Sequence, residues 1–244
     1  MEPGALELVD VNTRFGYDAR RGVMTTPGQV KRAGRKWGVV RAYTCSFKAI
    51  LFDCEEGNQE TLDLCAADEH FRPVAVACPT GMYSPTRTDK IREGGFAMVR
   101  LFPDIHGYAV DNTACARLVE GLSEAGIAVM LPTAASETTR LAHLLRGRQG
   151  TFILTHNRYG VLGELLALAG FLPSVYVESS DVMTPDGIAA VAETVSPSQL
   201  LWGSNYPMLN VGSSVMVLRG SGLAEDQIEM AASGNARRVL EVGR

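Results

Sequence analysis

Short apolar runs alternate with amphipathic stretches from one end of the chain to the other. Runs of aliphatic and β-branched residues that are bounded by turn residues are typical of buried parallel strands. Eight such runs predict strands at 7–15, 38–45, 72–78, 96–102, 127–131, 151–155, 174–178 and 200–202.

The segments between these runs have helical periodicity. In 112–126, Cys115, Leu118, Val119 and Leu122 repeat at i, i+3, i+4 and i+7, and Gly126 marks the end of the helix. Further helices are expected at 27–37, 55–70, 136–146, 161–171, 184–195 and 223–242, and the polar stretch 83–95 has room for only a short helix.

Eight strand–helix units in strict alternation predict an α/β fold, a (β/α)8 TIM barrel that forms one compact domain over residues 1–244. A doubly wound open sheet is the alternative. No glycine-rich phosphate-binding loop follows any of the strands, so nucleotide-binding folds are disfavoured.

Composition narrows the functional classes. The net charge is −4 and no basic stretch carries interleaved aromatic residues, which argues against a nucleic-acid partner. With 46% apolar and 20% charged residues, the composition is that of a globular protein with a large core. No apolar run could span a membrane, and the acidic N-terminal segment is unlike a signal peptide, so a cytoplasmic location is expected.

The cysteines and histidines show no metal-binding spacing. The five cysteines lack a CxxC pair and have apolar neighbours, so we expect reduced thiols that are mostly buried. The four histidines form neither HxH nor HExxH. We expect His70 and His143 on helix surfaces and His106 in an exposed loop.

Active sites of barrels lie at the C-terminal ends of the strands. The polar side chains that the predicted strands deliver to this end are Asp10, Asn12, Arg14, Tyr43, Arg100, His156, Glu178, Ser204 and Asn205. They form the candidate site.

Several motifs at these strand ends resemble family 2 of the amidohydrolase superfamily. The sequence LLWGSNYP at 200–207 is similar to its last barrel strand, where an aspartate that binds the metal stands at the position of Asn205. VDVNTRFG at 9–16 is similar to its opening Asp-x-His-x-His-Phe-Gly motif. Further similarity lies at 98–103, 126–133, 152–156 and 234–238. The resemblance implies a TIM barrel with a metal-dependent hydrolase as its ancestor.

The ligand positions that the resemblance identifies have changed. Asn12 and Arg14 stand in place of the two opening histidines, Pro132 in place of the fifth-strand histidine, and Asn205 in place of the aspartate. His156 is the ligand that is retained. A catalytic zinc needs about three anionic or imidazole ligands, so we expect no metal cofactor. A weak divalent-metal site built from Asp10, His156 and Glu178 is the alternative.

Three functions remain open from the sequence. The first is a metal-independent hydrolase or lyase of a small carboxylated substrate, with His156, Arg14 and Glu178 as catalytic residues. Substrate binding would then fall to Asn12, Tyr43, Arg100, Ser204 and Asn205. The second is a catalytically inactive small-molecule binding protein or assembly subunit, and the third is a metal hydrolase with rearranged ligands. The resemblance is also compatible with a homodimer.

Structural roles compete with these assignments. Asp10 and Arg14 could form a buried ion pair, and Arg100 could pair with Asp104. His156 could be tied by hydrogen bonds to Asn157 or Asn205, while Cys45 and Cys78 could be nucleophiles or buried thiols.

Overall fold

The computed structural model describes residues 6–80, 88–133, 138–157, 159–184 and 186–241. Its strands are β1 (Leu8–Asp18), β2 (Val23–Thr25), β3 (Val39–Ser46), β4 (Phe71–Ala77), β5 (Met98–Leu101), β6 (Ala128–Pro132), β7 (Phe152–Thr155), β8 (Val175–Glu178) and β9 (Leu200–Leu201). They form a nine-stranded sheet in the order β2-β1-β3-β4-β5-β6-β7-β8-β9. All neighbouring strands are parallel except β1 and β2, which form an antiparallel hairpin.

The sheet closes into a barrel where β1 meets the segment that follows β9. Thr13 of β1 forms a parallel bridge with Tyr206, which follows β9. The backbone N–H of Arg14 donates to the carbonyl of Tyr206 at 2.9 Å, and that of Val11 donates to Trp202 at 3.3 Å. The expected TIM barrel is therefore confirmed, with β1 and β3 to β9 as its eight parallel strands.

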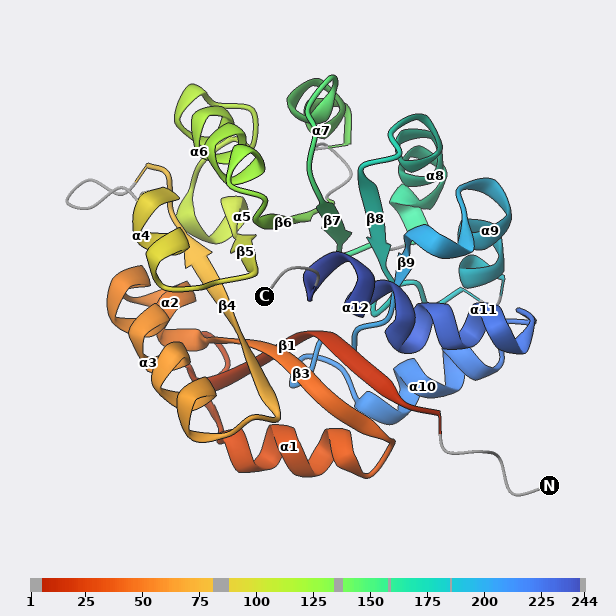
Figure 1. The fold of residues 1–244 in the computed structure, drawn as a ribbon, viewed down its shortest axis with the longest axis horizontal. Coiled ribbons are helices and arrows are strands. Elements are labelled where there is room, and N and C mark those ends of the chain that lie inside the picture. The colour runs from red at the N-terminus through yellow and green to blue at the C-terminus, as the bar shows by residue number, and fades with distance from the viewer. Residues whose placement is uncertain (1–5, 81–87, 134–137, 158, 185, 242–244) are drawn as a thin grey trace.

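Helices surround the strands, most of them in an outer ring, whereas α12 lies across one end of the barrel (Figure 1). They are α1 (Pro27–Arg35), α2 (Phe47–Leu51), α3 (Cys54–Ala67), α4 (Thr88–Glu93), α5 (Pro103–His106), α6 (Thr113–Glu124), α7 (Thr138–Leu145), α8 (Leu162–Phe171), α9 (Gly187–Thr194), α10 (Val211–Arg219), α11 (Glu225–Glu229) and α12 (Asn235–Leu240). Short 3₁₀ turns lie at Tyr159–Val161 and Pro197–Gln199, and a π turn at Met230–Gly234 joins α11 to α12.

Two apolar clusters hold the barrel together. One lies between the strands and the outer helices, and includes Leu8, Phe71, Leu122 and Trp202. The other fills the barrel and includes Val9, Tyr43, Met98 and Met130. Burial of these side chains provides the main driving force for folding. Ala236 and Leu240 of α12 belong to the interior cluster, so α12 closes the end of the barrel at which β1 begins.

Several elements differ from the expected ones. The β2 hairpin and helices α2, α5 and α10 were not predicted, because each is short or has a mixed apolar pattern. The expected closing helix at 223–242 is divided by the π turn. Parts of the helices expected at 136–146, 184–195 and 223–242, and of the polar stretch 83–95, lie outside the described residues.

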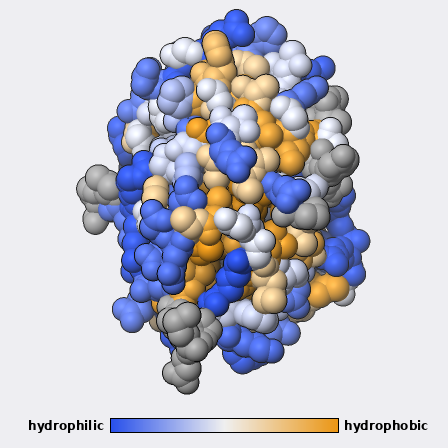
Figure 2. All heavy atoms as spheres, turned by 90° about the vertical axis from the view of Figure 1, so that its right-hand side faces the viewer, coloured by the Kyte–Doolittle hydropathy of each residue, from blue (hydrophilic) through white to orange (hydrophobic). Residues whose placement is uncertain are grey.

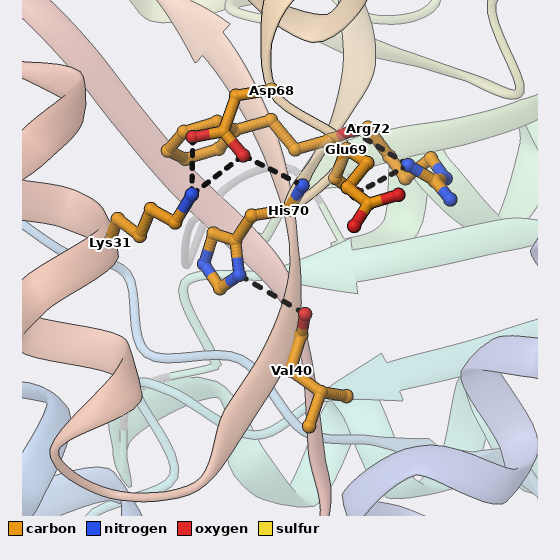
Figure 3. Close-up of polar contacts among 7 residues, drawn as sticks. Lys31, Val40, Asp68, Glu69, His70 and Arg72 are labelled. Carbon is orange, nitrogen blue, oxygen red and sulfur yellow. Dashed lines mark hydrogen bonds and ion pairs between the residues drawn. The ribbon is translucent and has the colours of Figure 1, made fainter.

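His70 is not on a helix surface, as the sequence suggested, but is buried between α3 and β4 (Figure 3). Its Nδ1 lies 3.1 Å from the carbonyl oxygen of Val40, and its backbone N–H donates to Asp68, which also binds Lys31. The helix stops before His70 because Asp68 has an extended backbone at the C-cap. His143 is exposed on α7 as expected.

The burial of the cysteines and of His106 agrees only in part with the expectations from the sequence. The cysteines are free, with Cys45 and Cys115 buried and the other three half-buried. His106 is not an exposed loop residue: it is half-buried at the end of α5, with Nε2 2.9 Å from the carbonyl of Ile50.

The outer surface has an apolar band on one side. Figure 2 shows it across the face that lies over the right-hand side of Figure 1, where α8, α9, α10 and α11 are found. Large apolar side chains exposed on two of these helices are Phe171 of α8 and Met216 of α10. No helix in the described part of the chain is long and apolar enough to cross a membrane.

Candidate active site

The first barrel strand brings three of the expected polar residues inside the molecule. Asp10, Asn12 and Arg14 of β1 are each at least 95% buried. The pairing of β1 with β3 is irregular between Asp10 and Thr13, as in a β-bulge, which redirects side chains relative to the regular pleat. Asn12, within this irregular stretch, and Arg14, just after it, both reach across the barrel to residues at other strand ends.

Asp10 is fixed by backbone groups. One carboxylate oxygen, Oδ1, accepts hydrogen bonds from the N–H groups of Asn12 at 3.1 Å and Ser204 at 2.9 Å. Burial raises the pKa of Asp10 to about 6, and the hydrogen bonds from Ser204 oppose this rise. The described contacts contain no ion pair between Asp10 and Arg14, so the ion pair that the sequence allowed is not formed. Asp10 instead attaches β1 to the segment after β9.

Glu178 lies at the end of β8 in a completely buried position. Its Oε2 accepts from Asn12 Nδ2 at 3.0 Å and from the hydroxyl of Ser180 at 2.8 Å, while Oε1 accepts from the Ser180 N–H at 2.7 Å. Burial raises the pKa of Glu178 to about 7, although the hydrogen bonds from Ser180 and Asn12 work in the opposite direction. A carboxyl group with such a pKa can give or take a proton near neutral pH.

Two arginines converge on one aromatic ring in the same part of the barrel. The Cζ atoms of Arg14 and Arg100 lie 5.9 Å and 4.9 Å from the centroid of the Phe102 ring. Arg14 donates from Nη2 to Asn205 Oδ1 at 2.6 Å, and Arg100 donates from Nη1 to Asn12 Oδ1. Both bonds end on neutral amide oxygens.

Neither guanidinium has a carboxylate partner among the described residues, so the pairing of Arg100 with Asp104 that the sequence allowed is not formed. Arg14 Nε and Arg100 Nη2 are buried and make no hydrogen bond. Burial, followed by repulsion from Arg100, lowers the pKa of Arg14 to about 9, and burial also lowers the pKa of Arg100. Arg14 remains charged near pH 7, since a pKa of about 9 leaves about 1% of a base unprotonated there.

Two residues in the loops after β7 and β9 have a left-handed backbone conformation. His156 has φ 60° and Asn205 has φ 54°, a region that residues other than glycine seldom occupy. Asn205 also donates from Nδ2 to Asp181 Oδ2 at 3.3 Å, which fixes its amide orientation toward Arg14. His156 is half-buried at the end of β7, and its neighbour Asn157 is bound to Leu154, Thr133 and the Glu178 carbonyl.

The structure thus joins five of the expected site residues, Asn12, Arg14, Arg100, Glu178 and Asn205, in one hydrogen-bonded network. Ser180 and Asp181 connect the Arg14–Asn205 pair to the other three. Asp10, described above, and three further candidates lie differently. His156 stands at the C-terminal end of a neighbouring strand, Tyr43 belongs to the apolar cluster inside the barrel, and Ser204 uses its N–H for Asp10 and its hydroxyl for the Tyr206 N–H.

Three further residues shape the network and were not assigned to it from the sequence. Phe102 supports both arginines, and Asp181 orients Asn205. Gly203 leaves the room that Glu178 needs, because a Cβ there would press against Glu178 Oε1 and come within 3.0 Å of Asn12 Cβ. Gly203 could have been found as the small residue directly after a buried strand, but the others required the cross-barrel geometry.

Cys45 lies beside the network in the neighbouring strand. It pairs with Arg14 in the register of β1 and β3 and is 1% exposed. Burial raises its pKa, against the opposing effect of Arg100 and Arg14. A thiol that stays protonated is a poor nucleophile, so this position supports the buried-thiol interpretation.

The donors at this site do not fit a catalytic metal ion. The described residues contain no group of three or more His, Cys, Asp or Glu side chains arranged to hold one. Arg14 binds directly to Asn205, so a permanent cation joins two positions where the family resemblance places metal ligands. Asn12 points its amide N–H, which cannot ligate a metal, toward Glu178.

Comparison with solved structures shows the same fold in several enzymes. Dihydroxybenzoic acid decarboxylase from Polaromonas sp. JS666, with bound manganese and the inhibitor 2-nitroresorcinol, has a TM-score of 0.80 at 11% identity, over 98% of each chain. 5-Carboxyvanillate decarboxylase from Sphingomonas paucimobilis has a TM-score of 0.75 at 15% identity, over 97% of this chain and 99% of that one. A probable 2-pyrone-4,6-dicarboxylic acid hydrolase from Acinetobacter baumannii, with citric acid bound, has a TM-score of 0.73 at 11% identity, over 96% of this chain and 99% of that one.

The sequence itself matches one family. No curated protein matches it. A family model described as amidohydrolase matches residues 48–242, which is most of the chain and includes strands β4 to β9. The chain belongs to the amidohydrolase family.

Proposed function

We propose that this chain is a metal-independent hydrolase or lyase that acts on a small carboxylated substrate. The observation that carries the proposal is the pair of buried guanidinium groups, Arg14 and Arg100, that have no carboxylate partner in the part of the chain that the structure describes. The names of the related structures, decarboxylases and a hydrolase of carboxylic acids, support the same class of reaction.

The arginines would bind the substrate's anionic group. Burying an unpaired charge is costly, and the cost falls when a counter-charge with good hydrogen-bond geometry arrives. The buried N–H groups at Arg14 Nε and Arg100 Nη2 are donors that a carboxylate can satisfy. The same cations can stabilise negative charge that develops in the transition state, which is the electrostatic role that a metal has in other enzymes.

Glu178 and His156 would move the proton. In a decarboxylation, the bond from carbon to the leaving CO2 breaks, its electron pair stays on carbon, and Glu178 in its protonated form supplies the proton. In a hydrolysis, His156 would take a proton from water as the water attacks, and Glu178 would protonate the leaving group. The pKa of Glu178, which burial raises to about 7, suits both roles.

A second candidate is a carboxylate-binding protein without catalytic activity. The observation that favours it is that Asn12, Glu178 and Asn205 are all at least 96% buried and bound to one another or to their neighbours. Such a network could bind an anion through the arginines and still lack a proton donor that reaches the substrate.

The test is a screen for turnover in buffer treated to remove metals. Aromatic and aliphatic carboxylic acids would be followed for CO2 release, and carboxylated esters and lactones for acid release. We expect Glu178→Gln to lower kcat at least ~100-fold, the usual scale for loss of an acid/base group, and Arg14→Met to raise KM. Arg219→Met, on the exposed end of α10, is the matched control. Binding without any turnover would favour the second candidate, and turnover that is insensitive to Glu178→Gln would exclude the proposed mechanism.

A further inference from the structure

We infer that the site takes a dicarboxylate, with one carboxylate for each of the two buried arginines. The inference rests on the proposed anion-binding role of Arg14 and Arg100, and it specifies the substrate class of that site.

The two guanidinium groups are held apart by separate anchors. Asn205, in the loop after β9, holds Arg14, whereas Asn12 of β1 holds Arg100. Because an amide oxygen is a neutral acceptor, neither anchor cancels the charge that it binds. Among the described contacts, each arginine therefore has a positive charge that its anchor does not neutralise and a buried N–H group without a hydrogen-bond partner.

The nearby carboxylates are already committed to other donors. Glu178 accepts three hydrogen bonds from Asn12 and Ser180, and Asp10 accepts two from backbone N–H groups. Asp181 accepts from Asn205 and, at 3.5 Å, from the Ser180 hydroxyl. Within the described chain, none of these acids forms an ion pair with either arginine, although Glu178 and Asp181 attract both guanidinium groups at longer range.

Charge balance then sets the class of ligand. A monocarboxylate could neutralise one guanidinium and would leave the other buried and unpaired, which is the costly arrangement. A dianion satisfies both, and it also relieves the repulsion between two cations that share the Phe102 ring. Two carboxylates on one small skeleton match two separately anchored, planar guanidinium groups, because each pair can be bidentate.

Calorimetric titration tests the inference without requiring turnover. Wild-type protein at pH 7 would be titrated with glutarate and phthalate as dicarboxylates, butyrate and benzoate as matched monocarboxylates, and inorganic phosphate as a compact dianion. We expect at least one dicarboxylate to bind ~30-fold more tightly than its monocarboxylate partner, about 2 kcal/mol. Arg14→Met and Arg100→Met should each reduce this preference to a few-fold, whereas Arg219→Met should retain it.

The outcomes separate the two proposals. Dicarboxylate selectivity without turnover of any substrate would support this inference and contradict the hydrolase or lyase proposal. Turnover of monocarboxylates with equal affinity for both classes would do the reverse. No binding of any dicarboxylate, tighter binding of phosphate, or selectivity that survives both arginine substitutions would overturn the inference. If Arg100→Met fails to fold, as judged by its circular dichroism, Arg100→Lys replaces it. Lysine keeps the positive charge but lacks the planar pair of N–H groups that binds a carboxylate bidentately. An unchanged selectivity in Arg100→Lys would therefore also contradict the two-carboxylate geometry.

Discussion

Arg14 and Asn205 are joined by a 2.6 Å hydrogen bond from Nη2 to Oδ1, although 191 residues separate them in the sequence. The bond spans the seam at which the barrel closes, next to the backbone bridge between Thr13 and Tyr206. It places a cation between two positions where related proteins are expected to carry metal ligands, and it leaves Arg14 Nε without a partner.

Replacing Asn205 with aspartate should weaken anion binding. The new carboxylate would pair with Arg14 and compete with the ligand, so we expect at least ~10-fold lower affinity for dicarboxylates. Titration calorimetry measures the change. Asn210→Asp is the matched control, because Asn210 caps α10 and aspartate caps a helix equally well. Unchanged affinity in Asn205→Asp would mean that Arg14 does not bind the ligand.

Glu178→Gln should flatten the pH dependence of stability. The pKa of Glu178 is raised from 4.5 to about 7 in the folded state, so the native protein holds a proton that the unfolded chain releases. The contribution of this group is fully present below about pH 4.5 and is lost as the pH rises through 7. A shift of this size corresponds to about 3 kcal/mol between pH 4.5 and 8.

Urea unfolding of wild type and Glu178→Gln at pH 5 and pH 8 measures this effect. The variant should lose less stability than wild type between the two pH values. Exposed Glu193, replaced by glutamine, is the control and should behave as wild type. Parallel losses in all three proteins would show that Glu178 does not titrate in this range.

Substitution of Gly203 tests how closely the network is packed. In Gly203→Ala the new Cβ would meet Glu178 Oε1 and Asn12 Cβ, so we expect a loss of roughly 2 kcal/mol in unfolding free energy, together with loss of ligand binding. Gly163 of α8 is the control, because a Cβ there meets nothing within 4 Å and alanine favours a helix. A Gly203→Ala protein as stable as wild type would contradict the close contact between Gly203 and Glu178.

His70 should make the fold sensitive to mild acid. Burial, then the charges of Lys31 and Arg35, lower the pKa of His70 in the folded state below its usual 6.5. The unfolded chain therefore binds a proton more readily, and the stability present above pH 6.5 is lost as the pH falls toward the lowered value. Thermal unfolding at pH 7.5 and 5.5 should show a larger drop for wild type than for His70→Gln. His143→Gln, on the exposed face of α7, should match wild type.

The architecture could be predicted because the two kinds of element have different apolar patterns. Barrel strands are buried on both faces, whereas the helices around them are buried on one face only. Runs such as 127–131 and 151–155 are continuous apolar segments, and each became a strand of the barrel. The β2 hairpin escaped notice because Val23 and Met24 are largely exposed and pair with the polar end of β1. Local pattern carries no signal for such a strand.

The sequence indicates which residues line the candidate site, but it does not indicate which of them contact one another. Strand ends identify Asn12, Arg14, Arg100, Glu178 and Asn205, since all parallel strands finish at the same side of the barrel. Which of them touch depends on pairs more than 80 residues apart, such as Arg100 with Asn12. The ion pair between Asp10 and Arg14, which the sequence left open, does not form because the backbone of Ser204, from the far end of the chain, reaches Asp10 instead.

If the guanidinium pair takes the place of the family's metal ion, the site should have no affinity for divalent cations. Equilibrium dialysis of the purified protein against Zn²⁺ or Mn²⁺, followed by elemental analysis, measures this affinity. We expect metal far below one equivalent per chain, with the same residual content in wild type and His156→Ala. About one equivalent per chain that disappears in His156→Ala would contradict this expectation and establish a metal centre at the barrel mouth.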